Sequence, residues 1–174
     1  MSAMLATDFG DAAMAAAERV GINAESLAGI GQVESNFHNV PTANGSSSAT
    51  GPWQVTARTW QSTVAAHNLG YSIADMTNPS ANAVVASYII RDYAGAVSNA
   101  TGQPATTLDA YGAYIFGPTA GAQLATANAN ASLSSFISSQ ALANNGMQSW
   151  SVGDFRSVFG SRLGSSASQL VLSL

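Results

Sequence analysis

Residues 24–37 read AESLAGIGQVESNF, and the spacing of their apolar side chains predicts a helix. At 3.6 residues per turn one face of this helix would carry Leu27, Ile30, Glu34 and Phe37. A carboxylate on an apolar face is costly to desolvate, so its pKa is expected to rise towards neutrality. A general acid that acts at neutral pH needs such a pKa, and Glu34 is therefore a candidate catalytic residue. The alternative is a Glu at the helix end that faces solvent or pairs with an arginine.

Helical patterns account for most of the remaining chain. Capping residues precede several of them, including Asn23, Thr56 and Asn78, and Pro79 follows the last. Strand-like alternation is nearly missing, and no repeat of fixed period is found. The expected fold is mainly α, with residues 1–174 in one domain that ends in an irregular tail. Helices are expected over residues 9–20, with Thr7 or Asp8 as the cap, and over 24–37, 57–70, 79–99, 107–116, 120–127, 132–143 and 155–163.

A polar, glycine-bearing segment over residues 39–55 follows the helix that carries Glu34. Because no hydrophobic period survives in it, it is expected to form a loop or a very short irregular hairpin. The segment ends in GPWQ, residues 51–54, which places an aromatic ring and an amide near Glu34. Trp stacks on sugar faces and Gln hydrogen-bonds hydroxyl and acetamido groups, so Trp53 and Gln54 are candidate binding residues. The alternative is that Trp53 is a core anchor that merely closes the loop.

Tyr111, Tyr114 and Phe116 form an aromatic run within a helical pattern. A phenol directed at a buried carboxyl group can donate a hydrogen bond to it and fix its orientation. The alternative is that these rings belong to the core, as aromatic residues at helical spacing usually do.

The composition excludes several classes of function. Apolar residues make up 47% of the chain and charged residues 8%, with no lysine, no cysteine and a net charge of −4. Without lysine there is no Schiff base or P-loop, and without cysteine there is no disulfide or thiolate nucleophile. The negative charge argues against nucleic acid as a partner, whereas many Ser, Thr, Asn and Gln residues suit a neutral polar ligand such as a sugar. No apolar run approaches the length of a membrane span.

The other ionisable residues are weaker candidates. His38 and His67 lie far apart without acidic residues at ligand spacing, so they make a poor metal site. A serine nucleophile beside His38, at Ser35 or within residues 46–48, lacks the Gly-x-Ser-x-Gly elbow. Glycosidases usually use two carboxylates, and Asp75 is the only plausible second one, because most other acids fall in first turns of expected helices. The case for Asp75 is weak, which favours a mechanism with one carboxylate.

Three segments resemble, in order, motifs of the lytic transglycosylases of the soluble-transglycosylase (goose-lysozyme-like) superfamily. Residues 32–37 are similar to the family's Glu-Ser motif at a helix end. Residues 48–60 are similar to its glycine-bearing loop that ends in Gln, followed by a helix with a Thr-Trp pair. Residues 113–118 are similar to its Ala-Tyr-Asn segment before Gly-Pro, and the helix over 78–93 also fits. The resemblance covers residues 24–124.

The resemblance implies a lysozyme-like multi-helix fold and a reaction on peptidoglycan strands, with no metal or organic cofactor. Family members cleave the β-1,4 bond between N-acetylmuramic acid and N-acetylglucosamine without water. Carried over, Glu34 would protonate the glycosidic oxygen and then deprotonate the muramoyl 6-hydroxyl as it closes a 1,6-anhydro ring. The substrate site would include Ser35 and Gln54, which hold the glycan, Tyr114, which orients Glu34, and the loop residues Gly51 and Trp53.

Two departures from the family pattern bear on substrate preference rather than on the acid. Pro52 and Trp53 stand where the family usually has an apolar pair such as Leu-Met, and Ile115 stands where it has Asn. The Trp would reshape the sugar cleft, and the loss of the Asn removes one polar contact near the glycan.

Two other functions are kept as alternatives. One is a lysozyme-type hydrolase on the same scaffold, with Asp75 or a held water in place of intramolecular attack. The other is a non-catalytic glycan-binding or structural component. The expected place of action is the bacterial cell wall, in the periplasm or associated with a virion. The first residues lack the features of a signal peptide, which suits a phage lysin or a part of an envelope-spanning machine; an excised domain of a larger protein would look the same.

Overall fold

Helices form nearly all of the regular structure in this computed structural model, which describes residues 1–7, 9–38 and 48–172. Within these residues, β-structure is limited to bridges between single residue pairs. The prediction of a mainly α fold is confirmed. The helices are α1 (Ser2–Leu5), α2 (Gly10–Val20), α3 (Ala24–Ser35), α4 (Ala57–Ala66), α5 (Pro79–Thr101), α6 (Thr107–Phe116), α7 (Pro118–Thr126), α8 (Ser139–Asn144) and α9 (Val152–Leu163), and the 3₁₀ turns are η1 (Ile73–Thr77), η2 (Leu133–Ser135) and η3 (Gly164–Ser166).

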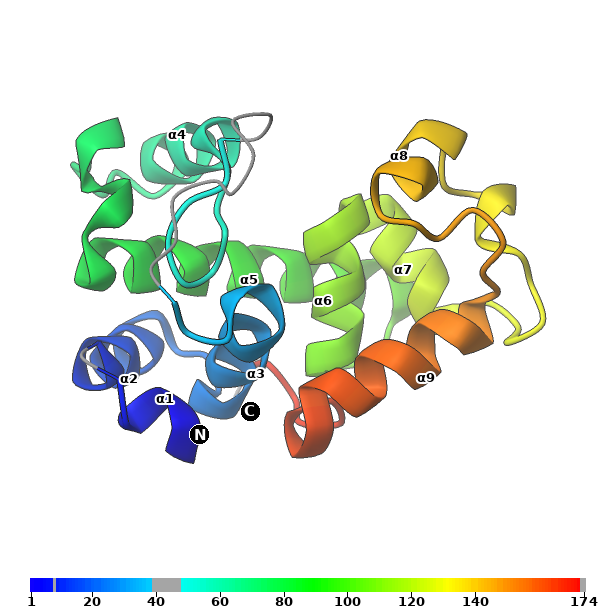
Figure 1. Cartoon of the computed structure of the whole chain (residues 1–174), viewed down its shortest axis with the longest axis horizontal. Helices are drawn as coiled ribbons and strands as arrows, with labels where there is room; N and C mark the ends of the chain where they lie inside the picture. The colour runs from blue at the N-terminus through cyan, green and yellow to red at the C-terminus, as the bar shows by residue number, and fades with distance from the viewer. Residues whose placement is uncertain (8, 39–47, 173–174) are drawn as a thin grey trace.

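The long helix α5 runs through the middle of the molecule (Figure 1). It packs against α2, α6 and α7, and it buries much of its length. In the view of Figure 1, α1, α2 and α4 lie at the left, α7, α8 and α9 lie at the right, and α3 and α6 lie between them. Among the helices of the described residues, none combines the length and apolar character that crossing a membrane requires.

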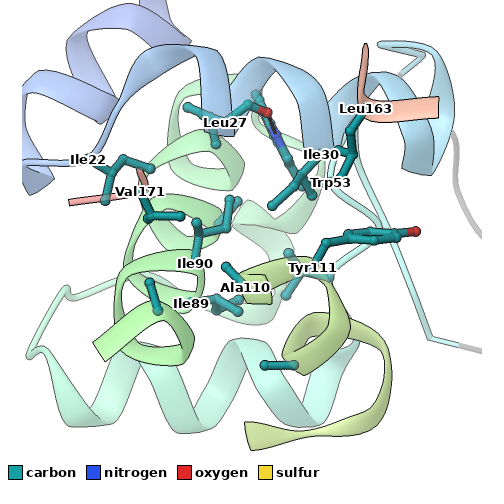
Figure 2. Close-up of a cluster of buried hydrophobic side chains, with 14 of the residues drawn as sticks. Ile22, Leu27, Ile30, Trp53, Ile89, Ile90, Ala110, Tyr111, Leu163 and Val171 are labelled. Carbon is teal, nitrogen blue, oxygen red and sulfur yellow. Dashed lines mark hydrogen bonds between the residues drawn. The ribbon is translucent and has the colours of Figure 1, made fainter. Parts of the chain in front are cut away.

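The core of the molecule lies where α3, α5 and α6 meet (Figure 2). Leu27 and Ile30 of α3 are fully buried, as are Ile90 of α5 and Ala110 of α6. This packing fixes the position of α3 relative to α6, the two helices that carry the candidate acid and the aromatic run.

The tail that follows α9 is docked rather than frayed over its described part. Val171 is fully buried in the same core. Single bridges join Leu172 to Ile22 and Leu170 to Thr106. These bridges join the tail to the residues just before α3 and α6, although the tail sequence has no clear period.

Helix α3 ends earlier than the 24–37 pattern predicts. Asn36 and Phe37 adopt the left-handed conformation, with φ of 51° and 60°, and this stops the helix after Ser35. Phe37 is nevertheless buried and packs near Phe9, with ring centroids 6.5 Å apart. The apolar spacing therefore identified a buried residue correctly, but the residue lies beyond the helix.

The helix starts predicted at residues 24, 57, 79 and 107 are confirmed by their caps, Asn23, Thr56, Asn78 and Thr106. In each case the side-chain oxygen of the cap accepts a hydrogen bond from a main-chain amide two or three residues further on. Helices α7 and α9 begin earlier than predicted, at Pro118 and not 120, and at Val152 and not 155. Ser151 caps α9, and both Thr106 and Ser151 form capping boxes with an Asp.

The first predicted helix differs at its start. Helix α2 begins at Gly10 with no side-chain cap, and a short helix, α1, precedes it. The hydroxyl of Thr7 donates a hydrogen bond of 2.6 Å to the main-chain oxygen of Met4 instead of capping α2. The other predicted cap, Asp8, lies outside the described residues, as do residues 39–47 of the polar segment.

Two other predicted helices are too long. The one over 57–70 ends as α4 at Ala66. The one over 132–143 divides into η2 and α8, because Ser138 adopts an extended conformation and its hydroxyl caps α8. The first error concerns a helix end, which local patterns define poorly, whereas the second is a break inside the predicted helix.

Candidate active site

A cleft of about 340 Å³ lies beside the last turn of α3, where α3, α6 and α9 come together. Val33 and Glu34 line it from α3, and Gln54 lines it from the turn that follows. The remaining lining residues come from α6 and from the segment that leads into and includes α9: Tyr111, Tyr114, Ile115, Asn145, Met147, Phe159 and Arg162. The cleft thus combines a carboxyl group, an amide and phenols with an apolar floor.

Glu34 is half-buried at the edge of this cleft. Burial raises the pKa of its carboxyl group from 4.5 to about 7, because the carboxylate form loses its hydration. The hydroxyl of Tyr111 donates a hydrogen bond of 2.8 Å to Oε1, which acts in the opposite direction and lowers this pKa. The result is a carboxyl group that exchanges its proton near neutral pH, as its place on the apolar face of the helix predicted.

Tyr111 is fixed by the packing of its ring. The ring is buried on α6 and lies 5.2 Å from the ring of Phe159, measured between centroids. Figure 2 shows its hydroxyl pointing out of the core cluster. Burial, together with the neighbouring charge of Glu34, raises the pKa of Tyr111 well above its usual value. The phenol therefore keeps its proton and can act as the donor to Glu34 across the neutral range.

Tyr114, predicted to orient Glu34, contacts a different group. Its hydroxyl donates a hydrogen bond of 2.5 Å to the main-chain oxygen of Trp53. Tyr111 and Tyr114 are one turn apart on α6 with their rings stacked at 6.3 Å, so helical spacing alone does not distinguish them. The prediction named the wrong tyrosine. Tyr111 is the phenol bonded to Glu34, and Tyr114 holds the main chain at Trp53.

A tight turn between Thr50 and Val55, the 50–55 turn, forms the second side of the site. The two residues exchange main-chain hydrogen bonds of 2.9 and 3.1 Å, which makes the predicted very short irregular hairpin. Gly51 has a φ of 79°, and a Cβ atom placed on it would lie 2.5 Å from the amide of Asn82. Only glycine suits this position. Gly51 is buried, so it shapes the turn and does not face the cleft.

Gln54 is the residue of the 50–55 turn that faces the cleft. It has a left-handed φ of 47°, and its Nε2 donates a hydrogen bond of 2.9 Å to the oxygen of Gly51. It lines the same cleft as Glu34. The structure therefore brings together the two residues that the sequence singled out, and the role of Gln54 in binding stays a prediction.

Trp53 is a core residue and not a sugar-stacking one. Its side chain is fully buried, and its Nε1 donates a hydrogen bond of 2.8 Å to the main-chain oxygen of Leu27. The indole reaches α3 because Gly31 has no side chain there; a Cβ atom on Gly31 would lie 2.9 Å from Nε1. The prediction that Trp53 contacts the glycan is therefore wrong, because its ring has no exposed face, and the alternative of a core anchor holds.

Ser35 is committed to the 50–55 turn. Its hydroxyl donates a hydrogen bond of 2.7 Å to the main-chain oxygen of Pro52, and Ser35 is not among the residues that line the cleft. A direct contact between Ser35 and the glycan has no support in this geometry. Its observed role is to attach the turn to the end of α3.

The two histidines do not form a catalytic or metal site among the described residues. Nδ1 of His38 lies 3.0 Å from the main-chain oxygen of Ser35, and not beside its hydroxyl. His67 pairs with Asp92, with Nε2 and Oδ2 2.7 Å apart. Within the described part of the chain, no three His, Asp or Glu side chains are placed to hold a metal ion.

Asp75, the proposed second carboxylate, serves as a helix cap. Oδ2 accepts hydrogen bonds of 2.7 Å from the main-chain amide and 2.8 Å from the hydroxyl of Ser72, in a capping box at the start of η1. These bonds hold the pKa of Asp75 below its usual value. Asp75 does not line the cleft that contains Glu34, so the structure does not support its pairing with Glu34.

Comparison of the sequence with known protein families finds a match. The sequence model of the family described as Transglycosylase SLT domain matches residues 11–135, which is more than half of the chain. The chain belongs to this family. The comparison with curated proteins finds no match. Membership in the SLT family agrees with the lysozyme-like helical fold and assigns the protein to the domains that act on the peptidoglycan of the bacterial cell wall.

The SLT match ends before one wall of the cleft begins. Asn145, Met147, Phe159 and Arg162 all follow residue 135, yet they line the same cleft as Glu34. Sequence reasoning missed these four residues, because no local pattern shows that α9 folds back onto α6. The only available signal was the apolar spacing of the last helix, which predicts packing but does not identify the neighbour.

Two smaller hollows adjoin the cleft. Gln54 and Tyr114 also line a hollow of about 60 Å³ that includes Tyr93 and Thr59. Those last two residues in turn line a third hollow of about 240 Å³ between α4 and α5. The shared residues make the three hollows neighbours, so a row of hollows runs from α9 past Glu34 towards α4.

Proposed function

We propose that the protein is a peptidoglycan lytic transglycosylase that cleaves the β-1,4 bond between N-acetylmuramic acid and N-acetylglucosamine and leaves a 1,6-anhydromuramoyl end. The observation that carries this proposal is the state of Glu34. Its carboxyl group lines a cleft, accepts a hydrogen bond from Tyr111 and has a pKa of about 7. A carboxyl group of this kind can donate a proton at neutral pH and accept one in the next step.

In the first step, protonated Glu34 gives its proton to the glycosidic oxygen. The bond from this oxygen to C1 of the muramoyl residue breaks, and N-acetylglucosamine leaves with a new 4-hydroxyl group. Positive charge develops at C1, as in other glycosidase transition states. The substrate's own 2-acetamido oxygen stabilises that charge, so the protein need not supply a second carboxylate.

In the second step, the Glu34 carboxylate removes the proton from the muramoyl 6-hydroxyl, and O6 bonds to C1. This closes the 1,6-anhydro ring and returns Glu34 to its protonated form, so no water is consumed. A raised pKa suits both steps, since it makes the acid available at neutral pH and the carboxylate basic enough to act. The hydrogen bond from Tyr111 keeps the group in one orientation throughout.

The lining of the cleft favours this reaction over hydrolysis with two carboxylates. Glu34 is the single acidic residue among the described residues that line it. Asp75, the other candidate, is engaged as a cap. A retaining or inverting glycosidase would need a second carboxyl group within several ångströms of the first. We therefore infer intramolecular attack by the 6-hydroxyl.

The extended site suits a strand-like substrate. We infer that Gln54, which lines the same cleft as Glu34, hydrogen-bonds a hydroxyl or acetamido group of the glycan. Ser35, Gly51 and Trp53 would act indirectly by holding the 50–55 turn. The place of action would be the bacterial cell wall, in the periplasm or associated with a virion.

The test is digestion of purified peptidoglycan by the unmodified protein and by Glu34→Gln, with mass spectrometry of the released muropeptides. Products lighter than the hydrated muropeptides by one water, formed only by the unmodified protein, are expected. Hydrated products would make the protein a lysozyme-type hydrolase. Equal activity of both proteins would remove Glu34 from the mechanism, and no release by either would leave a glycan-binding or structural role.

A further inference from the structure

Arg162 is the basic residue that lines the Glu34 cleft. It lies in the last turn of α9, is exposed, and holds its guanidinium carbon 5.2 Å from the centroid of the Phe159 ring. A guanidinium over an aromatic face is favourably placed and loses few of its donors to the contact. Arg162 therefore presents a positive charge at the mouth of the proposed active site.

The charge of Arg162 is not neutralised by the described residues. The single ion pair among them joins His67 to Asp92. Arg91 and Arg156, in contrast, donate hydrogen bonds to main-chain oxygens elsewhere in the fold. No hydrogen bond joins Arg162 to another described residue, so its donors are available to a ligand in the cleft.

The position of Arg162 is fixed by rings that also support Glu34. Phe159 is buried, and it packs on Tyr111 with centroids 5.2 Å apart and on Phe155 with centroids 4.8 Å apart. Tyr111 in turn donates its hydrogen bond to Glu34. The guanidinium therefore rests on the same aromatic layer whose Tyr111 hydroxyl orients the carboxyl group of Glu34.

A planar guanidinium binds a carboxylate through two parallel hydrogen bonds, and this pairing is more selective than the attraction of a point charge. Peptidoglycan strands carry carboxylates, whereas the sugar rings themselves are neutral. We propose that Arg162 is a specificity-determining residue that binds a carboxylate of the strand while Glu34 faces the scissile bond. The carboxylate belongs either to the lactyl group of a muramic acid without a stem peptide or to a stem peptide. This inference rests on the proposed function.

Arg162 acts on the substrate rather than on the acid. The pKa of Glu34 is set by burial and by the hydrogen bond from Tyr111, and Arg162 is not among its causes. Loss of the guanidinium should thus raise KM and leave the pH profile of kcat unchanged. A residue that merely supported α9 would instead lower the thermal stability.

The test measures binding in the Glu34→Gln background, where no turnover occurs. Three probes are compared: soluble strands with stem peptides, strands stripped of them by an amidase so that every lactyl carboxylate is free, and N-acetylglucosamine oligomers of matched length. Arg162→Gln is compared with Arg58→Gln, which removes the same charge from an exposed position on α4 that does not line the cleft. Arg162→Lys keeps the charge but loses the planar geometry.

Arg162→Gln should weaken binding of an anionic probe about tenfold and leave binding of the neutral oligomers and the melting temperature unchanged. Arg162→Lys should recover part of the lost affinity, and Arg58→Gln should not change the affinity. The anionic probe with the larger loss identifies the source of the carboxylate. An equal loss on the neutral oligomers, an equal loss in Arg58→Gln, or no loss on either anionic probe would overturn the inference. The proposed function is tested independently by product release. If the unmodified protein releases no anhydro product, the proposed function is wrong, whatever the binding measurements show.

Discussion

The hydroxyl of Tyr111 donates a hydrogen bond of 2.8 Å to Oε1 of Glu34, and this contact joins α6 to the last turn of α3. It comes from a buried ring that packs on Phe159, so the donor is held in place from behind. No other hydrogen bond from the described residues reaches the carboxyl group. One oxygen of Glu34 is thus anchored by the fold.

Tyr111→Phe should shift the alkaline limb of the pH profile of kcat/KM to higher pH. The hydrogen bond lowers the pKa of Glu34, so its removal raises that pKa and keeps the acid protonated at higher pH. The loss of orientation should also lower kcat at the optimum by about tenfold. Release of anhydro products, followed from pH 4 to pH 9, checks both effects.

Tyr114→Phe is the matched control for that change. It removes the hydrogen bond to the oxygen of Trp53, which is not bonded to Glu34. The alkaline limb should stay in place, while the free energy of unfolding falls by about 1 kcal/mol because the 50–55 turn loses one attachment. If the limb moved in Tyr114→Phe and not in Tyr111→Phe, the assignment of the two phenols would have to be exchanged.

Glu34→Gln should be more stable than the unmodified protein above pH 7, with the difference vanishing near pH 4.5. Between the unfolded pKa of 4.5 and the folded pKa of about 7, the folded state binds the proton more tightly, so stability falls as pH rises. The loss of stability of the unmodified protein is complete above pH 7. It amounts to about 1–3 kcal/mol, because Glu34 is partly exposed. Urea unfolding of both proteins at pH 4.5 and pH 8 measures it, and parallel stability curves would contradict the raised pKa.

Gly51→Ala should destabilise the protein more than Gly70→Ala does. Both glycines have positive φ, 79° and 72°, so both substitutions strain the backbone by about 1 kcal/mol. At Gly51 the new Cβ atom would also collide with Asn82, whereas at Gly70 it would meet open space. A further cost of about 1–3 kcal/mol is expected at Gly51. Equal free energies of unfolding for the two variants would mean that Asn82 can move away.

Trp53→Phe and Gln54→Ala should have opposite effects on stability and on binding. Trp53→Phe removes the hydrogen bond to Leu27 and leaves a small cavity, so the free energy of unfolding should fall by about 2–3 kcal/mol with KM unchanged. Gln54→Ala removes a side chain that lines the cleft, so KM should rise about fivefold with little change in stability. A large rise in KM in Trp53→Phe alone would return Trp53 to the binding site.

Several helix starts and the location of Glu34 on a buried helix face could be predicted from the sequence. Caps such as Asn78 act within one turn, and the face that carries Glu34 follows from the helical period. Both depend on neighbours within a few residues, so one sequence contains the information. The predicted helix ends were less accurate. A residue such as Asn36, which ends a helix by adopting the left-handed conformation, is harder to recognise in a sequence than a cap at a helix start.

The contacts between distant segments could not be predicted. Whether Tyr111 or Tyr114 reaches Glu34 depends on the rotation of α6 against α3, and the two residues differ by less than one turn. The burial of Trp53 depends on its indole packing against Gly31 of α3, and this contact exists only in the folded protein. Arg162 lies in the cleft because α9 packs beside α3 and α6, which no local pattern specifies.

The attachments of the 50–55 turn have a consequence for how the site can vary through mutation. Ser35, Tyr114 and the amide of Gln54 all bond to main-chain oxygens of that turn, at Pro52, Trp53 and Gly51. Every residue type provides the same oxygen, so these bonds constrain the path of the backbone and not the identity of the side chains. Pro52 can therefore be exchanged for another residue that keeps this path. The support of Glu34 is thus insensitive to the identity of the side chain at residue 52, provided that the backbone keeps its path.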